Sequence, residues 1–271
     1  MFFKAFNEYY EKKRHQNASP LAQNRYKIDR KYDLTIDDTA RFEISMCEGL
    51  LVNIVPAAFW CMFFVYRRPA LLEEFRLGLD RYVEITHESN DCIIHNVDFK
   101  SILASYPLLA AVLKEVLRLL STNASGRVLL KDTLLDGKYL LKKDAVLLVP
   151  SAAVHNDPSV WGADWAEFNP NRWLKEDTQK VPLSAYRAFG GGSWPCPGRA
   201  FSLNEIAASL VMVILQYDLV PVDGEWKQVK TSSHINTSVL TPKEDIEVEV
   251  RPRKGTETVD WRFRWEGADL S

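Results

Sequence analysis

The chain has 271 residues, which is enough for one large domain or two small ones and for a sizeable buried core. Hydrophobic residues make up 46% of it and charged residues 26%, which is the balance of a soluble globular protein. Its formal net charge of −2 offers no bulk electrostatic attraction to nucleic acid or to an anionic membrane, so charge indicates neither as a partner.

The cysteines and the N-terminus exclude several other classes of protein. The four cysteines contain no C-x-x-C pair and are too few for a disulfide framework, which argues against a zinc or dithiol site. The N-terminus lacks the long apolar core of a signal peptide. Residues 49–66 carry no charge, but Asn53 and Pro56 interrupt this run, and a membrane span wants ~20 apolar residues. We therefore predict a buried helix there and no clear membrane anchor.

In chain order, hydrophobic spacing predicts mainly helices for the first 120 residues. The expected elements are an amphipathic helix, a polar linker, a long helix capped by Asp37 or Asp38, and two further helices, over residues 2–14, 17–38, 44–66, 69–83 and 106–120 respectively.

The pattern changes after residue 120. Residues 127–148 alternate in polarity and turn at Asp136-Gly137, which predicts a small sheet. A turn-rich stretch, a glycine loop, a helix and a strand are expected next, over residues 156–171, 190–192, 197–217 and 246–250. The predicted fold class is mainly α with a small β part.

The stretch Phe-Gly-Gly-Gly-Ser-Trp-Pro-Cys-Pro-Gly-Arg-Ala begins at Phe189 and carries the strongest chemical signal. Its glycines let the backbone pass close to a flat partner. Prolines on both sides of Cys196 fix φ and remove two N–H donors. The helix expected directly after Cys196 would stabilise a thiolate through its free N–H groups and positive dipole end. A buried structural cysteine is the alternative that the residues alone leave open.

This stretch resembles the haem-binding signature of the cytochrome P-450 superfamily, Phe-x-x-Gly-x-x-x-Cys-x-Gly. Phe189, Gly192, Cys196 and Gly198 match its fixed positions. The resemblance implies the C-terminal portion of the cytochrome P-450 fold and haem b as cofactor. It also implies that Cys196 is the axial ligand of the haem iron, because a cysteine thiolate holds the iron in this family.

Glu115 and Arg118 lie at i and i+3 of a predicted helix, which places both side chains on one face. On their own they would be an ordinary surface ion pair. Their place before Cys196 resembles the family's Glu-x-x-Arg motif, which pairs with a downstream arginine, and Arg172 matches that third position. The resemblance implies a buried structural triad, which must be complete because an orphaned buried charge is strongly destabilising.

One basic residue that often contacts a haem propionate in the family is replaced in this sequence. The family often has a basic residue two positions before the cysteine, and this chain has Trp194. Arg127 stands where the family often places a propionate-binding arginine, so the resemblance assigns it to the cofactor. A solvated strand end is the alternative for Arg127.

The family's central helix usually carries an acid followed by threonine, which help deliver protons. Val55 and Pro56 stand in that place, so Asn53 is the remaining polar candidate for a catalytic role, with a structural amide as the alternative. The pattern Asn-x-x-Pro-Ala-x-Phe-Trp resembles the branch that contains sterol 7α-hydroxylases and prostacyclin synthase, and related fungal members.

The resemblance implies an enzyme and a domain plan. Residues 1–37 would form an N-terminal helix and linker, 38–253 the haem-binding region, and 254–271 a C-terminal tail. The implied activity is a haem-thiolate monooxygenase that inserts one oxygen atom from O₂ into a small apolar substrate in secondary metabolism, with electrons from an NADPH-dependent reductase.

Two alternatives stay open. One is a peroxide isomerase that needs no reductase, because the branch that the central-helix pattern resembles includes such an enzyme. The other is a truncated relic without catalysis, because family members are usually nearly twice as long as this chain. The expected location is the cytoplasm or the periphery of the endoplasmic reticulum.

Overall fold

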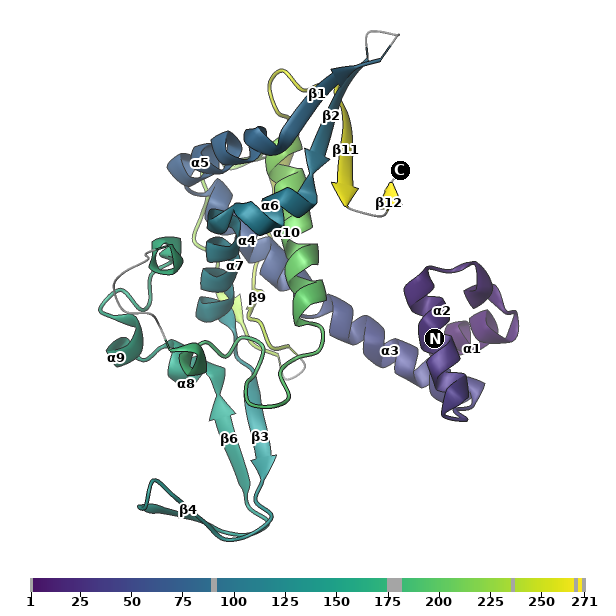
Figure 1. The fold of residues 1–271 in the computed structure, drawn as a ribbon. Helices are drawn as coiled ribbons and strands as arrows, with labels where there is room; N and C mark the ends of the chain where they lie inside the picture. The colour runs from purple at the N-terminus through teal and green to yellow at the C-terminus, as the bar shows by residue number, and fades with distance from the viewer. Residues whose placement is uncertain (1, 89–91, 175–181, 235–236, 266–267, 270–271) are drawn as a thin grey trace. The chain divides into compact units, whose positions relative to one another are not determined.

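The computed structural model describes residues 2–88, 92–174, 182–234, 237–265 and 268–269. The chain divides into two compact units, Met1–Asn53 and Ile54–Ser271. Helices predominate and the strands form small sheets (Figure 1), which confirms a fold that is mainly α with a small β part.

The first unit is helical from its beginning. Its elements are α1 (Phe2–Glu11), the 3-10 turn η1 (Arg14–Asn17), α2 (Pro20–Lys31) and α3 (Ile36–Leu51). The predicted linker over residues 17–38 is therefore wrong, because most of that segment is helix α2. Ser19 caps α2 by accepting the backbone N–H of Ala22, and Pro20 occupies the first helical position, where its missing N–H has no intrahelical partner to lose.

The start of α3 also differs from the prediction. Thr35, and not Asp37 or Asp38, caps the helix. The hydroxyl of Thr35 accepts the N–H of Asp38, and the carboxylate of Asp38 accepts the N–H of Thr35, which makes a reciprocal capping box.

The long helix predicted over residues 44–66 is two helices. α3 ends at Leu51, and α4 (Ile54–Tyr66) begins after a turn at Val52 and Asn53. Pro56 lies in the first turn of α4, where backbone N–H groups have no acceptor within the helix, so a proline is tolerated there. The uncharged run thus spans the end of one helix and the whole of the next.

Burial differs along this uncharged run. In α4, Ala57, Trp60 and Phe63 are at most 2% exposed, as predicted for a core helix, whereas Leu51 and Val55 are 59% and 58% exposed. The stretches Ile36–Tyr66 and Arg199–Gln216 are long and apolar enough to cross a bilayer. Length and composition decide nothing about a membrane here, because core helices of soluble proteins also meet this criterion.

The core of the second unit lies between α4, α5 (Pro69–Leu79), α7 (Pro107–Leu120) and α10 (Arg199–Gln216), with α6 (Phe99–Ser105) against them (Figure 1). The predicted helical spacing of α7 is confirmed, since Val112 and Val116 are fully buried. The shorter helical pieces are η2 (Asp80–Tyr82), α8 (Ser151–His155), α9 (Pro158–Trp161), η3 (Pro170–Trp173) and η4 (Leu183–Ala185).

A four-stranded sheet stands at one end of this helical core (Figure 1). Its strands, in spatial order, are β1 (Val83–His87), β2 (Ile93–Asp98), β11 (Asp260–Trp265) and β12 (Ala268–Asp269). β11 runs parallel to β2, with Phe263 opposite Val97. The segment expected as a C-terminal tail therefore contributes strands to this sheet.

The predicted small sheet is confirmed at the other end of the core (Figure 1). β3 (Ala124–Val128) pairs antiparallel with β6 (Val146–Pro150), and β4 (Thr133–Leu135) with β5 (Tyr139–Leu141). Asp136 and Gly137 both have positive φ, as a tight hairpin turn requires. The remaining pairs join β7 (Tyr217–Pro221) to β10 (Val248–Pro252) and β8 (Thr231–Ser232) to β9 (Thr241–Pro242).

Candidate functional site

The cysteine loop lies between η4 and α10. Cys196 is a free, exposed cysteine, and its backbone N–H donates to the carbonyl of Phe189 at 2.9 Å, which closes the loop. Gly190 and Gly192 have φ of +75° and +78°, a backbone conformation that residues with a Cβ rarely adopt. Glycine at these two positions is therefore required by the backbone path.

The helix predicted after the cysteine is present as α10. It begins at Arg199, with Gly198 as its N-cap and no side chain capping the first turn. A Cβ at Gly198 would lie 3.7 Å from the sulfur of Cys196, so the thiol lies directly beside the start of the helix. The positive end of the helix dipole there favours the anionic form of a sulfur ligand.

Arg127 reaches the glycine loop from β3. Its Nη2 donates to the carbonyl of Gly191 at 3.1 Å, and its Nη1 donates to the carbonyl of Gly126 at 2.7 Å. Trp194, which replaces the expected basic residue, is 86% exposed. The structure thus brings Arg127 and the cysteine loop together, and the role of Arg127 toward the cofactor stays a prediction.

Glu115, Arg118 and Arg172 form one ion-pair cluster. Arg118 donates from Nε and Nη2 to the two carboxylate oxygens of Glu115, at 3.0 and 2.8 Å. Arg172, from η3, donates from Nε to Glu115 at 2.9 Å. The side chains of Glu115 and Arg118 are 0% exposed, and that of Arg172 is 10% exposed. The contacts of the predicted triad are therefore present and buried.

The sequence did not indicate all members of this cluster. The indole N–H of Trp173 and the backbone N–H of Asn169 also donate to Glu115, at 2.8 and 3.1 Å. Asp164 supplies a second carboxylate to Arg172, with Nη2 to Oδ2 at 3.1 Å. Trp173 could have been suspected from its place next to Arg172, whereas the aspartate, eight residues away, carries no local signal.

Asn53 lies in the turn that follows α3, and not on a core helix as the sequence suggested. It is the last residue of the first unit and is half-buried. Its catalytic assignment remains a prediction.

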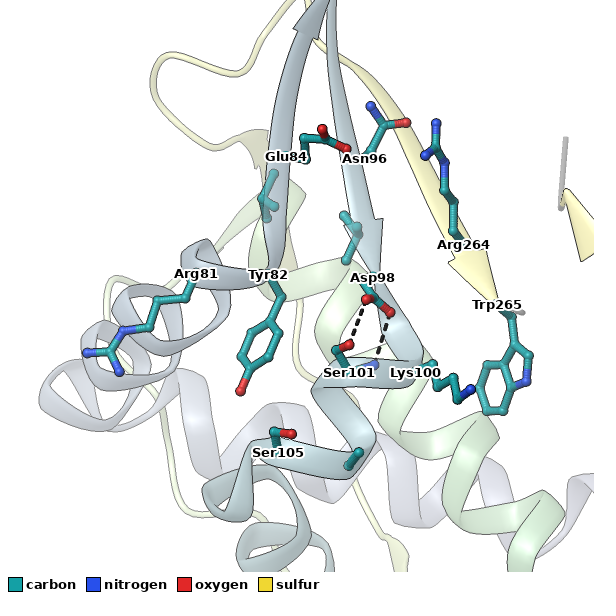
Figure 2. Close-up of a pocket in the computed structure, with 13 residues that line it drawn as sticks. Arg81, Tyr82, Glu84, Asn96, Asp98, Lys100, Ser101, Ser105, Arg264 and Trp265 are labelled. Atoms are coloured by element: carbon teal, nitrogen blue, oxygen red, sulfur yellow. Dashed lines mark hydrogen bonds between the residues drawn. The ribbon is translucent and has the colours of Figure 1, made fainter. Parts of the chain in front are cut away.

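A cavity of about 1150 Å³ lies away from the cysteine loop, between β1, β2, α6 and β11 (Figure 2). Figure 2 shows Asp98 held by Ser101, which donates to it from its hydroxyl and from its backbone N–H. The lining carries charges of both signs, including Arg81, Glu84, Asp98, Lys100 and Arg264. Since none of the predicted site residues lines this cavity, it is separate from the cysteine loop.

The residues around Cys196 fit a haem iron. In the part of the chain that the structure describes, no group of three or more His, Cys, Asp or Glu side chains could hold a bare metal ion. A single accessible thiol suits an iron whose in-plane ligands come from a porphyrin. The close-lying glycine backbone suits a flat ring, and the neighbouring guanidinium of Arg127 suits the ring's carboxylates.

Comparison with known proteins agrees with this geometry. The family model for cytochrome P-450 matches residues 7–250. The match begins well before residue 38, so it includes the second half of α1 and the whole of α2. A cytochrome P-450 monooxygenase, nodJ, of Hypoxylon pulicicidum is 35% identical over 269 residues, which cover 96% of this chain and 52% of that protein.

Two further relatives come from different kinds of protein. A bifunctional cytochrome P-450/NADPH–P-450 reductase of Alternaria alternata is 29% identical, over 77% of this chain and 18% of that protein. The cholesterol 7-alpha-monooxygenase of Cricetulus griseus is 28% identical, over 79% of this chain and 45% of that protein.

The chain spans about half the length of the first relatives that it matches, 52% and 50%. Its match to the family model nonetheless covers most of its own length, and the cysteine loop and the buried ion-pair cluster lie within the matched residues. The chain therefore belongs to the cytochrome P-450 family, whose cofactor is a haem iron.

Proposed function

We propose that this chain forms the haem-binding part of a haem-thiolate monooxygenase, with Cys196 as the axial ligand of haem b. The observation that supports this proposal most directly is the free, exposed thiol beside the uncapped start of α10, on a loop in which Gly190 and Gly192 have positive φ. The domain plan, with haem-binding residues over 38–253, is part of the same proposal.

Each proposed residue has a separate role. Cys196 binds the iron, and the glycine loop lets the ring approach the backbone. Arg127 pairs with a propionate, in place of the basic residue that Trp194 replaces. Glu115, Arg118 and Arg172 hold α7 and η3 together. When bound, a thiolate-ligated haem supplies the activation of O₂ for insertion into an apolar substrate.

The names of the relatives support a monooxygenase more than a peroxide isomerase. The relatives from Hypoxylon pulicicidum and Gibberella zeae are both called monooxygenases, and the protein from Alternaria alternata combines a cytochrome P-450 with an NADPH-dependent reductase. We therefore propose an NADPH-dependent reductase as electron donor and a small apolar substrate in secondary metabolism. A place in the cytoplasm or at the periphery of the endoplasmic reticulum is proposed with them.

The ligand assignment is tested by replacing Cys196 with serine, because a neutral hydroxyl is a poor substitute for a thiolate. The purified, haem-loaded chain is reduced and exposed to carbon monoxide, and its absorption spectrum is recorded. We expect the thiolate-type band in the wild type and in Cys47→Ser and Cys92→Ser, and its loss in Cys196→Ser. An unchanged band in Cys196→Ser would disprove the assignment.

The reaction class has a separate test. The haem-loaded chain is mixed with a cytochrome P-450 reductase, NADPH and isotopically labelled O₂, with a panel of small apolar compounds as substrates. A monooxygenase transfers label to the product only when NADPH is present. Turnover of a peroxide substrate without NADPH would identify the isomerase instead.

A further inference from the structure

His155 links the buried ion-pair cluster to the cysteine loop. It is the last residue of α8, and its side chain is 0% exposed. Its backbone carbonyl accepts Nη1 of Arg118 at 3.0 Å. Its ring Nε2 accepts the backbone N–H of Arg187 at 2.8 Å. One residue therefore contacts the ion-pair cluster through its backbone and the start of the loop through its ring.

The backbone of Arg187 is fixed on both sides. Its carbonyl accepts the N–H of Gly190 at 3.0 Å and the side-chain amide of Asn123 at 3.2 Å. Two residues further on, the carbonyl of Phe189 accepts the N–H of Cys196. The position of the Arg187 N–H therefore sets where the loop begins, and the loop closes on the cysteine.

The ring of His155 is held in one orientation. It stacks on Tyr186, with ring centres 5.8 Å apart, and meets Trp161 edge-on at 6.1 Å. Burial lowers the pKa of His155 to about 4, so the ring is neutral at physiological pH. Because Nε2 accepts a hydrogen bond, the proton of the neutral ring lies on Nδ1.

We infer that His155 is a positioning residue for the cysteine loop. Its ring accepts the hydrogen bond from the Arg187 N–H and so fixes the start of this loop relative to the Glu115–Arg118–Arg172 cluster. This rests on the proposed function, in which Cys196 binds the haem iron. His155 touches neither the thiol nor the cofactor in this role. Its contribution is the alignment of the loop, and not only the stability of the fold.

Three substitutions separate the effect of the Nε2 acceptor from the effect of the ring packing. His155→Gln places a carbonyl oxygen near the position of Nε2. His155→Asn keeps an amide but places its oxygen near the position of Nδ1. His155→Phe keeps the ring packing on Tyr186 and Trp161 without an acceptor. Each variant is made in the full chain, and its thermal unfolding midpoint is measured first.

The first readout needs no haem. Amide hydrogen exchange is followed in peptides from the loop (residues 186–198) and from α7 (residues 107–120). We expect about tenfold or greater acceleration in the loop of His155→Phe and His155→Asn, near wild-type exchange in His155→Gln, and unchanged exchange in α7 of all three. A role confined to general stability would accelerate α7 as well.

The second readout is the thiolate-ligated fraction of bound haem in reduced, carbon monoxide-treated samples. We expect this fraction to fall at least twofold in His155→Phe and His155→Asn and to recover in His155→Gln. If His155→Phe does not fold, the comparison of His155→Asn with His155→Gln decides. Equal loop exchange and equal thiolate fraction in those two variants would overturn the inference.

Failure of the proposed function would look different. In that case the wild type would show no thiolate-ligated haem, while the exchange experiment would still report whether His155 holds the loop. Wild-type thiolate ligation with no effect of any His155 substitution would reject the positioning role alone.

Discussion

Glu115 is the residue on which the ion-pair cluster depends. Its carboxylate accepts from Arg118, Arg172, Trp173 and the backbone of Asn169, so its loss would leave several buried donors without an acceptor. Arg172 is less isolated, because Asp164 pairs with it and is itself partly solvated. The two positions should therefore differ in how strongly they tolerate substitution.

We predict that Glu115→Leu lowers the free energy of unfolding by about 3–5 kcal/mol, because it leaves two buried guanidinium groups short of a counter-charge. Arg172→Leu should have a smaller effect, since Glu115 keeps Arg118. Both should reduce the yield of soluble, haem-loaded protein, measured by chemical unfolding and haem content. Lys12→Met, which breaks an exposed ion pair with Glu8 outside this cluster, is the matched control and should change little. Normal folding of Glu115→Leu with loss of turnover only would contradict the structural role.

At the scale of a helix, two glycines test whether helix propensity or side-chain packing decides how a substitution by alanine changes stability. Gly78 lies in α5, and a Cβ there would come within 2.5 Å of the hydroxyl oxygen of Tyr106 and within 2.6 Å of two of its ring carbons. Gly49 lies in α3, and a Cβ there would meet nothing within 4 Å. Intrinsic helix propensity favours alanine at both positions by up to ~1 kcal/mol.

We predict opposite signs for the two substitutions. Gly49→Ala should raise the free energy of unfolding by up to ~1 kcal/mol. Gly78→Ala should lower it by about 1–3 kcal/mol, because the tyrosine ring must shift to make room. Urea unfolding of both variants against the wild type gives the comparison. Equal stabilisation by both alanines would show that Tyr106 does not pack against Gly78 in solution.

For the whole molecule, exposed apolar side chains are the main reason to expect association. Many of them lie between residues 128 and 148, on or beside the β3–β6 and β4–β5 pairs: Val128, Leu130, Leu134, Leu135, Tyr139, Leu140, Val146 and Leu148. These pairs have two strands each, so their outer edges also offer unpaired backbone groups. Such surfaces bind other apolar surfaces or associate with copies of themselves.

We therefore predict that the isolated chain self-associates or binds membranes through this segment. Light scattering and alkaline carbonate extraction measure the two outcomes. Leu130→Lys combined with Leu140→Lys should reduce association at equal concentration, whereas Phe2→Lys in the first unit, also an exposed apolar residue, should have little effect. A wild-type chain that is monomeric and takes up haem stoichiometrically would show that these exposed side chains do not limit it.

The sequence by itself determined the features that depend on neighbouring residues. Helices α7 and α10 follow from the spacing of apolar residues, and the turn at Asp136-Gly137 follows from the residues that tolerate positive φ. The cysteine loop, with its fixed glycines, is likewise a local motif. The family membership could be recognised from these motifs for the same reason.

Only the tertiary structure decided the features that depend on distant partners. β2 pairs in parallel with β11, which lies more than 160 residues later in the chain. Strand pairing over such a separation produces no local pattern in the sequence. Helix α2 is polar in composition, so its residues predicted a linker. Contacts with α3 support it, because Arg25 donates to Glu43 and Arg30 donates to Thr39. His155 resembles any histidine at the end of a short helix until the fold brings the Arg187 N–H to its ring. Contacts between distant segments, and not residue spacing, set these outcomes, because they exist only once the chain has packed.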